Sequence, residues 1–323
     1  MNEERRARLG FWLRSALGVV GLGALVWLVH NAGPRAVLAV MREGIAWLPL
    51  MVALELCRIG CESVGCYLAF ADRARTIPRL TLFRANLLGQ SLSNFAPAPR
   101  LVNETVKASV IAPYTGVAAA AAVGFTLQAA TLIAIGFFSI PCGVAIYLLE
   151  GRSLWMWAMV VHGLVLVASG VGLRLAARAE GIGRWVARVF PRTSSGTAAF
   201  AGQARSVGVL ALGPALALTG NRVFQVLQFL VAGRAVGIDA GLVHAFAVQG
   251  VNLVASAVGV LVPGGLGTTD GAFALSATML GTTLERATSL ALMVRCNQLI
   301  WLLIGSITLF VGGRSSRRKG GEQ

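Results

Sequence analysis

The sequence predicts an all-α, polytopic membrane protein, and three observations carry that prediction. Of the 323 residues, 56% are hydrophobic and only 13% are charged, and the mean hydropathy is +0.73. A soluble globular domain carries roughly 25% charged residues, because its surface must face water. The apolar residues also occur in runs of membrane-spanning length, and these runs are separated by short basic clusters.

Six apolar runs are long enough to cross the ~30 Å hydrocarbon core of a bilayer as helices. The first run follows a basic stretch but lacks a small-residue cleavage site, so we expect a retained anchor helix and not a cleaved signal peptide. The expected spans cover residues of about 13–30, 47–71, 114–138, 153–174, 207–233 and 287–312.

Two further apolar segments, about 80–111 and 240–281, are interrupted by proline and glycine. The first breaks at Pro97 to Pro99 and the second at Pro263 to Gly265. Irregular backbone at membrane depth is tolerated only inside protein or beside a water-filled cavity. The sequence therefore predicts six full spans plus two broken or re-entrant segments, or eight spans if each broken segment crosses twice.

The basic clusters predict the orientation of the spans. Arginines before residue 15 and the basic tail 313–323 place both termini in the cytoplasm by the positive-inside rule. Two inner loops are expected around residues 73–79 and 174–205, the latter as an interfacial amphipathic helix with Trp185 and Phe190 on its apolar side. We expect a multi-pass protein of the cell inner (plasma) membrane.

Residues 1–312 are expected to form a single transmembrane domain with an inverted internal repeat. The pseudo-repeats cover about 13–150 and 153–312, and each contains two spans, a broken segment and a further span. Glu104 follows Pro97 by seven residues, and Asp270 follows Pro263 by seven. Inverted repeats with broken helices are typical of secondary transporters that bind substrate near the midplane.

Two arginines lie near the middle of apolar spans, Arg58 and Arg222. A charge at that depth costs about 2.5–3.5 kcal/mol on insertion scales, so it usually faces a polar cavity or an anionic partner. Glu55 and Glu62 share a helix face with Arg58. They form either an internal ion-pair ladder or a polar stripe that lines a cavity and leaves Arg58 available to a phosphate.

Each broken segment is expected to resume as a short helix. Asn103 is a candidate N-cap for a helix from Glu104 to Ala112, and Thr268 or Thr269 for one from Asp270 to about Leu280. These helix N-termini favour an anion. Alternatively, Glu104 and Asp270 are themselves the capping anions, or they carry protons. Arg295 either pairs with Asp270 or joins the other arginines in a basic cavity.

Several function classes are not supported by the sequence. It contains no Walker A loop, no HExxH or Gly-x-Ser-x-Gly motif, and no closely spaced aspartates for Mg²⁺. The cysteines and histidines lack zinc-ligand spacing. We expect no catalytic residues, no metal and no cofactor. We also expect no nucleic-acid partner, because the basic residues form no continuous basic domain.

The two broken segments together resemble a flippase-like family that includes the transmembrane domain of lysylphosphatidylglycerol synthases. The first motif stands here as Asn94, Pro97/Pro99, Arg100, Glu104 and Lys107, and the second as Pro263 to Gly271 with Gly264, Gly265, Gly267, Thr269 and Asp270.

This sequence departs from the family pattern at three points. Asn103 stands where the family tends to have glycine, and Asp270 replaces glutamate. The arginine expected in the span after the first motif is missing, because Phe125 to Gln128 occupies that stretch.

The resemblance implies translocation of an anionic or zwitterionic lipid between leaflets, with membrane lipids as the partners. We expect a cavity lined by the arginines and both broken segments, with the carboxylates serving for ion coupling or pairing. The alternatives are a transporter of a small soluble anion, or a non-catalytic partner of a separate lipid- or glycan-modifying enzyme. The candidate binding residues are Arg58, Arg222, Arg295, Arg100, Lys107, Asn94, Gly264, Gly265, Gly267 and Thr269; the candidate coupling residues are Glu55, Glu62, Glu104 and Asp270.

Overall fold

The structure is a computed structural model that describes residues 26, 30, 33–93, 99–178, 194–208, 211–239, 241–262, 265 and 267–319. These residues form helices and connecting turns without strands, which confirms the all-α prediction. Some sequence predictions lie outside the described residues. They concern the span 13–30, Asn94, Pro97, Pro263, Gly264, and the expected amphipathic helix at Trp185 and Phe190.

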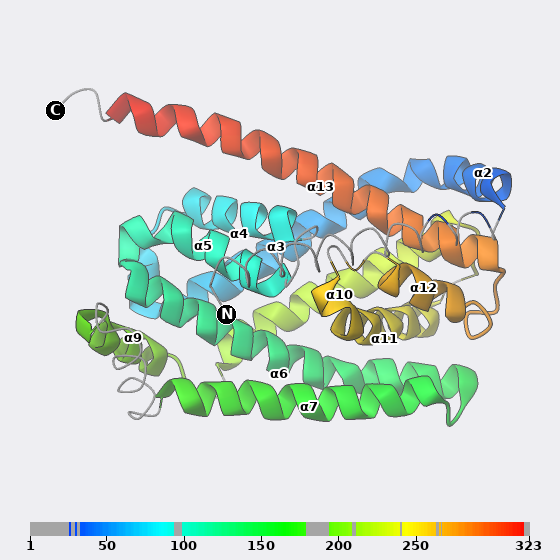
Figure 1. Cartoon of the computed structure of the whole chain (residues 1–323), viewed down its shortest axis with the longest axis horizontal. Coiled ribbons are helices and arrows are strands. Elements are labelled where there is room, and N and C mark those ends of the chain that lie inside the picture. The colour runs from blue at the N-terminus through cyan, green and yellow to red at the C-terminus, as the bar shows by residue number, and fades with distance from the viewer. Residues whose placement is uncertain are drawn as a thin grey trace, which may run out of the picture.

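The order of the described helices along the chain can be followed in Figure 1. The first part of the chain forms α2 (Pro34–Gly44), η1 (Ile45–Trp47), α3 (Leu48–Phe70), η2 (Ala71–Thr76), α4 (Arg79–Ser93), α5 (Pro99–Thr115) and α6 (Val117–Glu150). The second part forms α7 (Leu154–Arg178), α9 (Ser194–Ser206), α10 (Leu212–Ala235), α11 (Leu242–Val258), η4 (Gly259–Leu261), α12 (Thr268–Leu275) and α13 (Leu284–Lys319).

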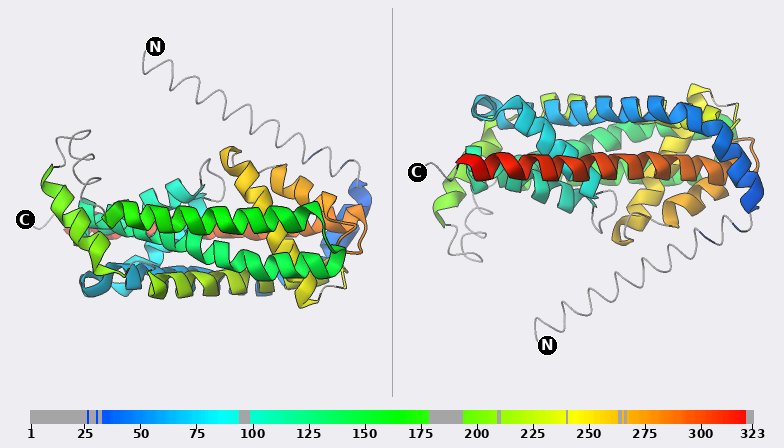
Figure 2. Two further views of the ribbon diagram at one scale, coloured as in Figure 1. Left: turned by 90° about the horizontal axis from the view of Figure 1, so that it is seen from below. Right: turned by 90° about the horizontal axis from the view of Figure 1, so that it is seen from above.

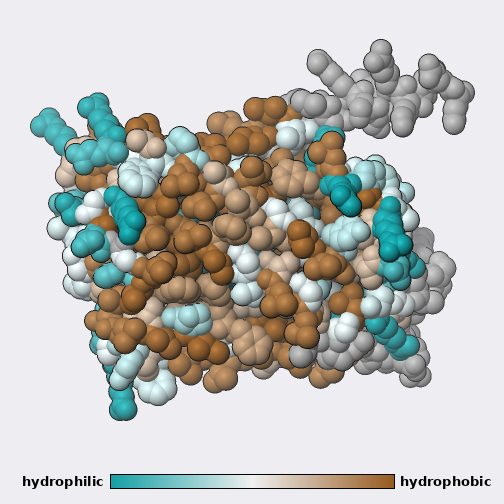
Figure 3. All heavy atoms as spheres, turned by 180° about the vertical axis from the view of Figure 1, so that it is seen from behind, coloured by the Kyte–Doolittle hydropathy of each residue, from teal (hydrophilic) through white to brown (hydrophobic). Residues whose placement is uncertain are grey.

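Five helical stretches of the described chain are long and apolar enough to cross a membrane: α3 with its flanks, α6, α7, α10 and the first 25 residues of α13. They coincide with five of the six expected spans. The outer surface is apolar through the middle of the bundle, and hydrophilic residues gather toward its two ends (Figure 3). Large apolar side chains such as Leu164 and Ile140 are exposed, as suits contact with lipid. The chain is therefore a multi-pass membrane protein.

Helix α6 is longer than the sequence predicts. The expected span ended at residue 138, whereas α6 continues to Glu150. Pro141 lies inside the helix without ending it, and the sequence stays apolar through Leu149. Gly151 has a φ of 69°, a left-handed conformation in which glycine is favoured, and its N–H bonds to the carbonyl oxygen of Tyr147.

Both broken segments form pairs of helices, α4 with α5 and α11 with α12, which occupy opposite halves of the bundle (Figure 1). The second pair cannot be two full crossings, because the eight residues of α12 span only about 12 Å of a ~30 Å hydrocarbon core. The length of α12 thus favours a re-entrant second segment, and the total number of spans stays a prediction. The inverted repeat stays a prediction.

The helix after Pro99 begins and ends at other residues than the sequence predicts. Asn103 is not an N-cap, because α5 begins four residues earlier, at Pro99, and continues through Pro113 to Thr115. Proline is favoured at the first helical position, where its fixed φ suits the helix and its missing N–H is not needed. Helix α12 likewise starts at Thr268 and ends at Leu275, with turns from there to Gly281.

Helices α6 and α7 run side by side (Figures 1 and 2), and glycines let their backbones approach closely. A Cβ atom built on Gly170 would lie 2.9 Å from the carbonyl oxygen of Ala129 and 2.7 Å from a side-chain carbon of Ile133. Gly136 and Gly163 face each other along the same contact. Close approach of small residues is a main source of helix association in lipid, where burial of apolar surface contributes little.

Helix α9 is attached to the bundle through two buried polar side chains. Gln203 donates to the carbonyl oxygens of Ala69 and Phe70 at the end of α3. The guanidinium of Arg174 donates to Thr126 Oγ1 and to the carbonyl oxygens of Ala204, Val207 and Gly208. The sequence placed Arg174 among the loop charges, and this was wrong. The residue is 1% exposed inside α7, because carbonyl groups at the end of α9 satisfy it.

The α6–α7 contact yields a test with a matched control on one helix. Gly170→Ala should lower the free energy of unfolding by about 1–3 kcal/mol, because the new methyl group must displace packed atoms. Gly172→Ala should be neutral or stabilising, because a Cβ there meets nothing within 4 Å and alanine favours helix. Unfolding in detergent, followed by a dye that reacts with the buried thiols Cys66 and Cys142, measures both. Equal effects of the two substitutions would contradict the proposed close contact.

Candidate functional site

Arg58 forms a buried ion pair within α3, and hydrogen bonds connect this pair to α10. Its Nη1 atom lies 2.5 Å from Glu55 Oε2 and 3.0 Å from Gln228 Oε1. Gln228 closes the group, because its Nε2 atom donates to Glu55 Oε2 and to the carbonyl oxygen of Met51, both at 2.9 Å. Of the two alternatives for Arg58, the described contacts fit the internal ion pair. Gln228 was missed by the sequence analysis, because a neutral amide in an apolar span gives no charge signal.

Glu62 does not extend the ladder to Arg58 but faces α5. Its Oε1 atom accepts a hydrogen bond of 3.3 Å from Asn103 Nδ2 and lies 3.9 Å from Lys107 Nζ. Lys107 is buried, and its Nζ atom lies 2.6 Å from Glu104 Oε1, one helical turn away. Asn103 and Lys107 thus connect the first broken segment to the centre of α3.

Arg100 lies in the first turn of α5, on the face that also carries Asn103, Glu104 and Lys107. It is half-buried and interacts electrostatically with Glu62 and Glu104. Within the described part of the chain it makes no hydrogen bond and no ion pair within 4 Å.

Arg222 lies at mid-helix in α10 and is half-buried. The next residue back, Asn221, donates a 3.0 Å hydrogen bond to the carbonyl oxygen of Arg58, which places Arg222 level with Arg58 on the facing helix. Arg222 Nη1 donates to Gln225 Oε1 at 2.6 Å, and the same oxygen accepts from Gln249 of α11. No carboxylate of the described residues lies within 4 Å of Arg222.

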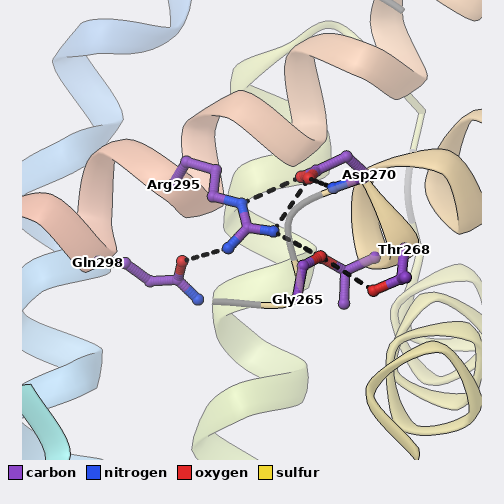
Figure 4. Close-up of polar contacts among 7 residues, drawn as sticks. Gly265, Thr268, Asp270, Arg295 and Gln298 are labelled. Atoms are coloured by element: carbon purple, nitrogen blue, oxygen red, sulfur yellow. Dashed lines mark hydrogen bonds and ion pairs between the residues drawn. The ribbon is translucent and has the colours of Figure 1, made fainter. Parts of the chain in front are cut away.

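The second broken segment is held to α13 by Arg295 (Figure 4). Its Nε and Nη2 atoms reach the two carboxylate oxygens of Asp270 at 3.1 and 3.0 Å. Nη2 also donates to Thr269 Oγ1 and to the Gly265 carbonyl oxygen, and Nη1 donates to Gln298 Oε1. Of the two alternatives for Arg295, pairing with Asp270 is the one observed.

The side chain of Asp270 also caps the N-terminus of α12. Its Oδ2 atom accepts a 2.9 Å hydrogen bond from the N–H of Gly267, the N-cap residue. Gly265 and Gly267 have φ angles of 59° and 76°, which glycine adopts without strain. The N–H of the N-cap residue therefore binds the Asp270 carboxylate, which fits the alternative in which the carboxylate itself is the capping anion.

The sequence-predicted residues fall into two groups. The first, which we call the α3–α5–α10 cluster, contains Arg58 and Arg222 with the members of the first broken segment. The contacts described for Arg295 stay within α13, α12 and the Gly265 turn. The hollow beside Glu104 and Lys107 has a volume of about 10 Å³, room for about one water molecule. The members of the α3–α5–α10 cluster are Glu55, Arg58, Glu62, Arg100, Glu104, Lys107 and Arg222.

Asp270 and Arg295 offer a second test of stability. Asp270→Asn or Arg295→Gln should each destabilise the protein by about 3–5 kcal/mol, because either change leaves the other charge buried and unpaired. The double variant should be more stable than the sum of the two losses predicts. Unfolding in detergent measures all four proteins of the cycle, and strictly additive losses would contradict the pairing.

The comparisons with known proteins give one match. The family described as lysylphosphatidylglycerol synthase TM region matches residues 11–305, which include both broken segments and every member of the cluster. No curated protein and no solved structure matches the chain. Since the match covers most of the sequence, the chain belongs to the family of the lysylphosphatidylglycerol synthase transmembrane region.

Proposed function

We propose that this protein moves an anionic or zwitterionic phospholipid between the leaflets of the cell inner membrane. The observation that carries the proposal is Arg222, a mid-span arginine whose described hydrogen-bond partner is only the neutral amide of Gln225. Arg58 and Arg295, by contrast, each have a carboxylate. Because an unneutralised charge at this depth is costly, a ligand that supplies the missing anion fits the site.

A lipid phosphate suits this position. The planar guanidinium stays charged and can bind two phosphate oxygens at once. No nitrogen of Arg222 is among the fully enclosed, unpaired polar atoms of the described residues, whereas Arg58 Nε is. The remaining donors of Arg222 therefore keep some access to their surroundings. Arg100, half-buried on α5, supplies a second guanidinium, and the mutual repulsion of the two cations favours an anion beside them.

The proposal includes an orientation with both termini in the cytoplasm. Gln203 holds α9 against the end of α3, so the loop arginines of η2 lie at the same end of the bundle as α9. The opposite end carries acidic and basic residues in nearly equal number, among them Glu43, Glu150 and Arg152. The positive-inside rule places the α9 end in the cytoplasm.

The proposal assigns no catalytic step to this chain. Without an ATP-binding motif in the sequence, transport is downhill or coupled to an ion. The half-buried carboxylates Glu62 and Glu104 are the candidates for coupling, because Lys107 lies between them.

One observation favours a second candidate function, a non-catalytic membrane partner of a lipid-modifying enzyme. Lys107 and Arg58 are already paired with carboxylates, and the hollow beside Lys107 is too small for a headgroup. A bundle that stays closed in this way would hold an enzyme at the membrane without moving lipid. Transport by the purified protein alone distinguishes the two.

The test is lipid scrambling in liposomes that contain the purified protein. Arg222→Gln should slow movement of a fluorescent phospholipid about 10- to 100-fold, since a hydrogen bond to a charged group contributes about 1.5–3 kcal/mol. Arg234→Gln is the matched control, with the same change on the same helix but in its exposed last turn. It should transport like the wild type.

Equal rates for the wild type and the Arg222 variant would remove this arginine from the mechanism. A wild-type protein that is folded but moves no lipid would favour the partner function. Thermal unfolding in detergent shows whether each variant is still folded. A slow variant that is folded has lost the binding site and not the fold.

A further inference from the structure

The α3–α5–α10 cluster contains an unequal number of positive and negative charges. Its cations outnumber its carboxylates by four to three, which leaves one positive charge. The cations are Arg58, Arg100, Lys107 and Arg222, and the carboxylates are Glu55, Glu62 and Glu104.

Helix contacts bring these groups together around the middle of α3. Asn221 joins α10 to α3 beside Arg58, and Asn103 joins α5 to α3 at Glu62. Arg100 is on the same face of α5 as Asn103, so it also faces Glu62. Arg222 interacts electrostatically with the charges of both neighbouring helices, including Glu62.

Two of the three carboxylates already form ion pairs with cations of the cluster. Glu55 is paired with Arg58 at 2.5 Å, and Glu104 with Lys107 at 2.6 Å. Only Glu62 remains for Arg100 and Arg222, and it already accepts from Asn103 and lies 3.9 Å from Lys107. Glu62 is thus the one remaining negative charge for two arginines, neither of which lies within 4 Å of a carboxylate of the described residues, so one positive charge is left without a counter-charge.

The neighbouring segments do not correct this imbalance. The sequence between α4 and α5 is Asn94 to Ala98, and the sequence before α12 is Pro263 to Gly267; neither contains an ionisable side chain. Asp270 and Arg295 carry one charge of each sign and pair with each other.

We propose that the cluster selects headgroups with one net negative charge, a phosphodiester without an amine, over zwitterionic and cationic headgroups. This inference rests on the proposed function and names the substrate class of the same site. A single negative charge neutralises the cluster, and a zwitterion does not. A headgroup ammonium would also have to compete with Arg100, Arg222 and Lys107 for Glu62.

The experiment measures scrambling of phosphatidylglycerol and of phosphatidylethanolamine, each as a labelled lipid in liposomes of fixed composition. The wild type should move phosphatidylglycerol at least about tenfold faster, the change expected when a charged hydrogen-bonding group is left without its partner. Arg222→Gln brings the cluster to zero charge and should abolish or reverse this preference.

A second substitution tests charge balance apart from the loss of one side chain. Glu62→Gln in the Arg222→Gln background returns the cluster to one positive charge, and it should restore the preference for phosphatidylglycerol. Arg234→Gln should leave the ratio of the two rates unchanged. Soluble glycerophosphoglycerol, added as a competitor, separates recognition of the lipid from recognition of its free headgroup: inhibition assigns the site to the phosphodiester alone, and its absence assigns it to the intact lipid.

Failure of this inference is distinguishable from failure of the proposed function. Equal rates for the two lipids in an active wild type, or a ratio unchanged by Arg222→Gln, would overturn the inference and leave transport intact. If no lipid moves, binding of the two lipids to the purified protein, measured by native mass spectrometry, still decides it. A binding preference that depends on Arg222 supports the inference, and equal binding overturns it.

Discussion

Charges that lie inside a bilayer need partners there, and in this protein their pairing determines which helices touch. Gln228 from α10 binds both members of the Glu55–Arg58 pair of α3, so α3 and α10 cannot slide past each other without breaking buried hydrogen bonds to charged groups. Glu62 then holds α5 through Asn103. Buried ion pairs add little net stability compared with well-packed apolar residues, but breaking them is costly. They therefore specify the arrangement of the helices more than they strengthen it.

Each broken segment contains an acidic side chain that needs a counter-charge, and the two segments obtain it from different helices. Asp270 is neutralised by Arg295 from the following span, whereas Glu104 is neutralised by Lys107 of its own helix. The span after the first broken segment has no arginine to offer, and its Gly124 lies beside Glu104 instead. The second segment is thus tied to α13, while the first carries its own counter-charge. A ligand charge therefore fits beside the first broken segment, next to Glu62 and Arg100.

The sequence predicted the fold class and five described spans well, because the length of an apolar run determines whether a helix can cross hydrocarbon. It also identified Arg58, Arg222 and Arg295, since each charge interrupts an apolar run. Helix ends were predicted less well, as at Asn103, where proline chemistry outweighed capping. The partners Gln228 and Gln249 could not be found, because they are uncharged and their contacts depend on the rotation of packed helices. Arg174 was misplaced because basic residues near a span end usually face water.

The way in which α9 is attached determines which substitutions this helix can accept during evolution. Arg174 and Gln203 hold the ends of α9 and α3 by binding main-chain carbonyl oxygens, which every amino acid provides. Substitutions at Ala204, Val207 or Gly208 that keep the backbone path would preserve these bonds, whereas Arg174 itself has no equivalent replacement. Related sequences should therefore vary at the residues that offer only their carbonyl groups, while retaining Arg174 and the Gln203 amide that anchor α9.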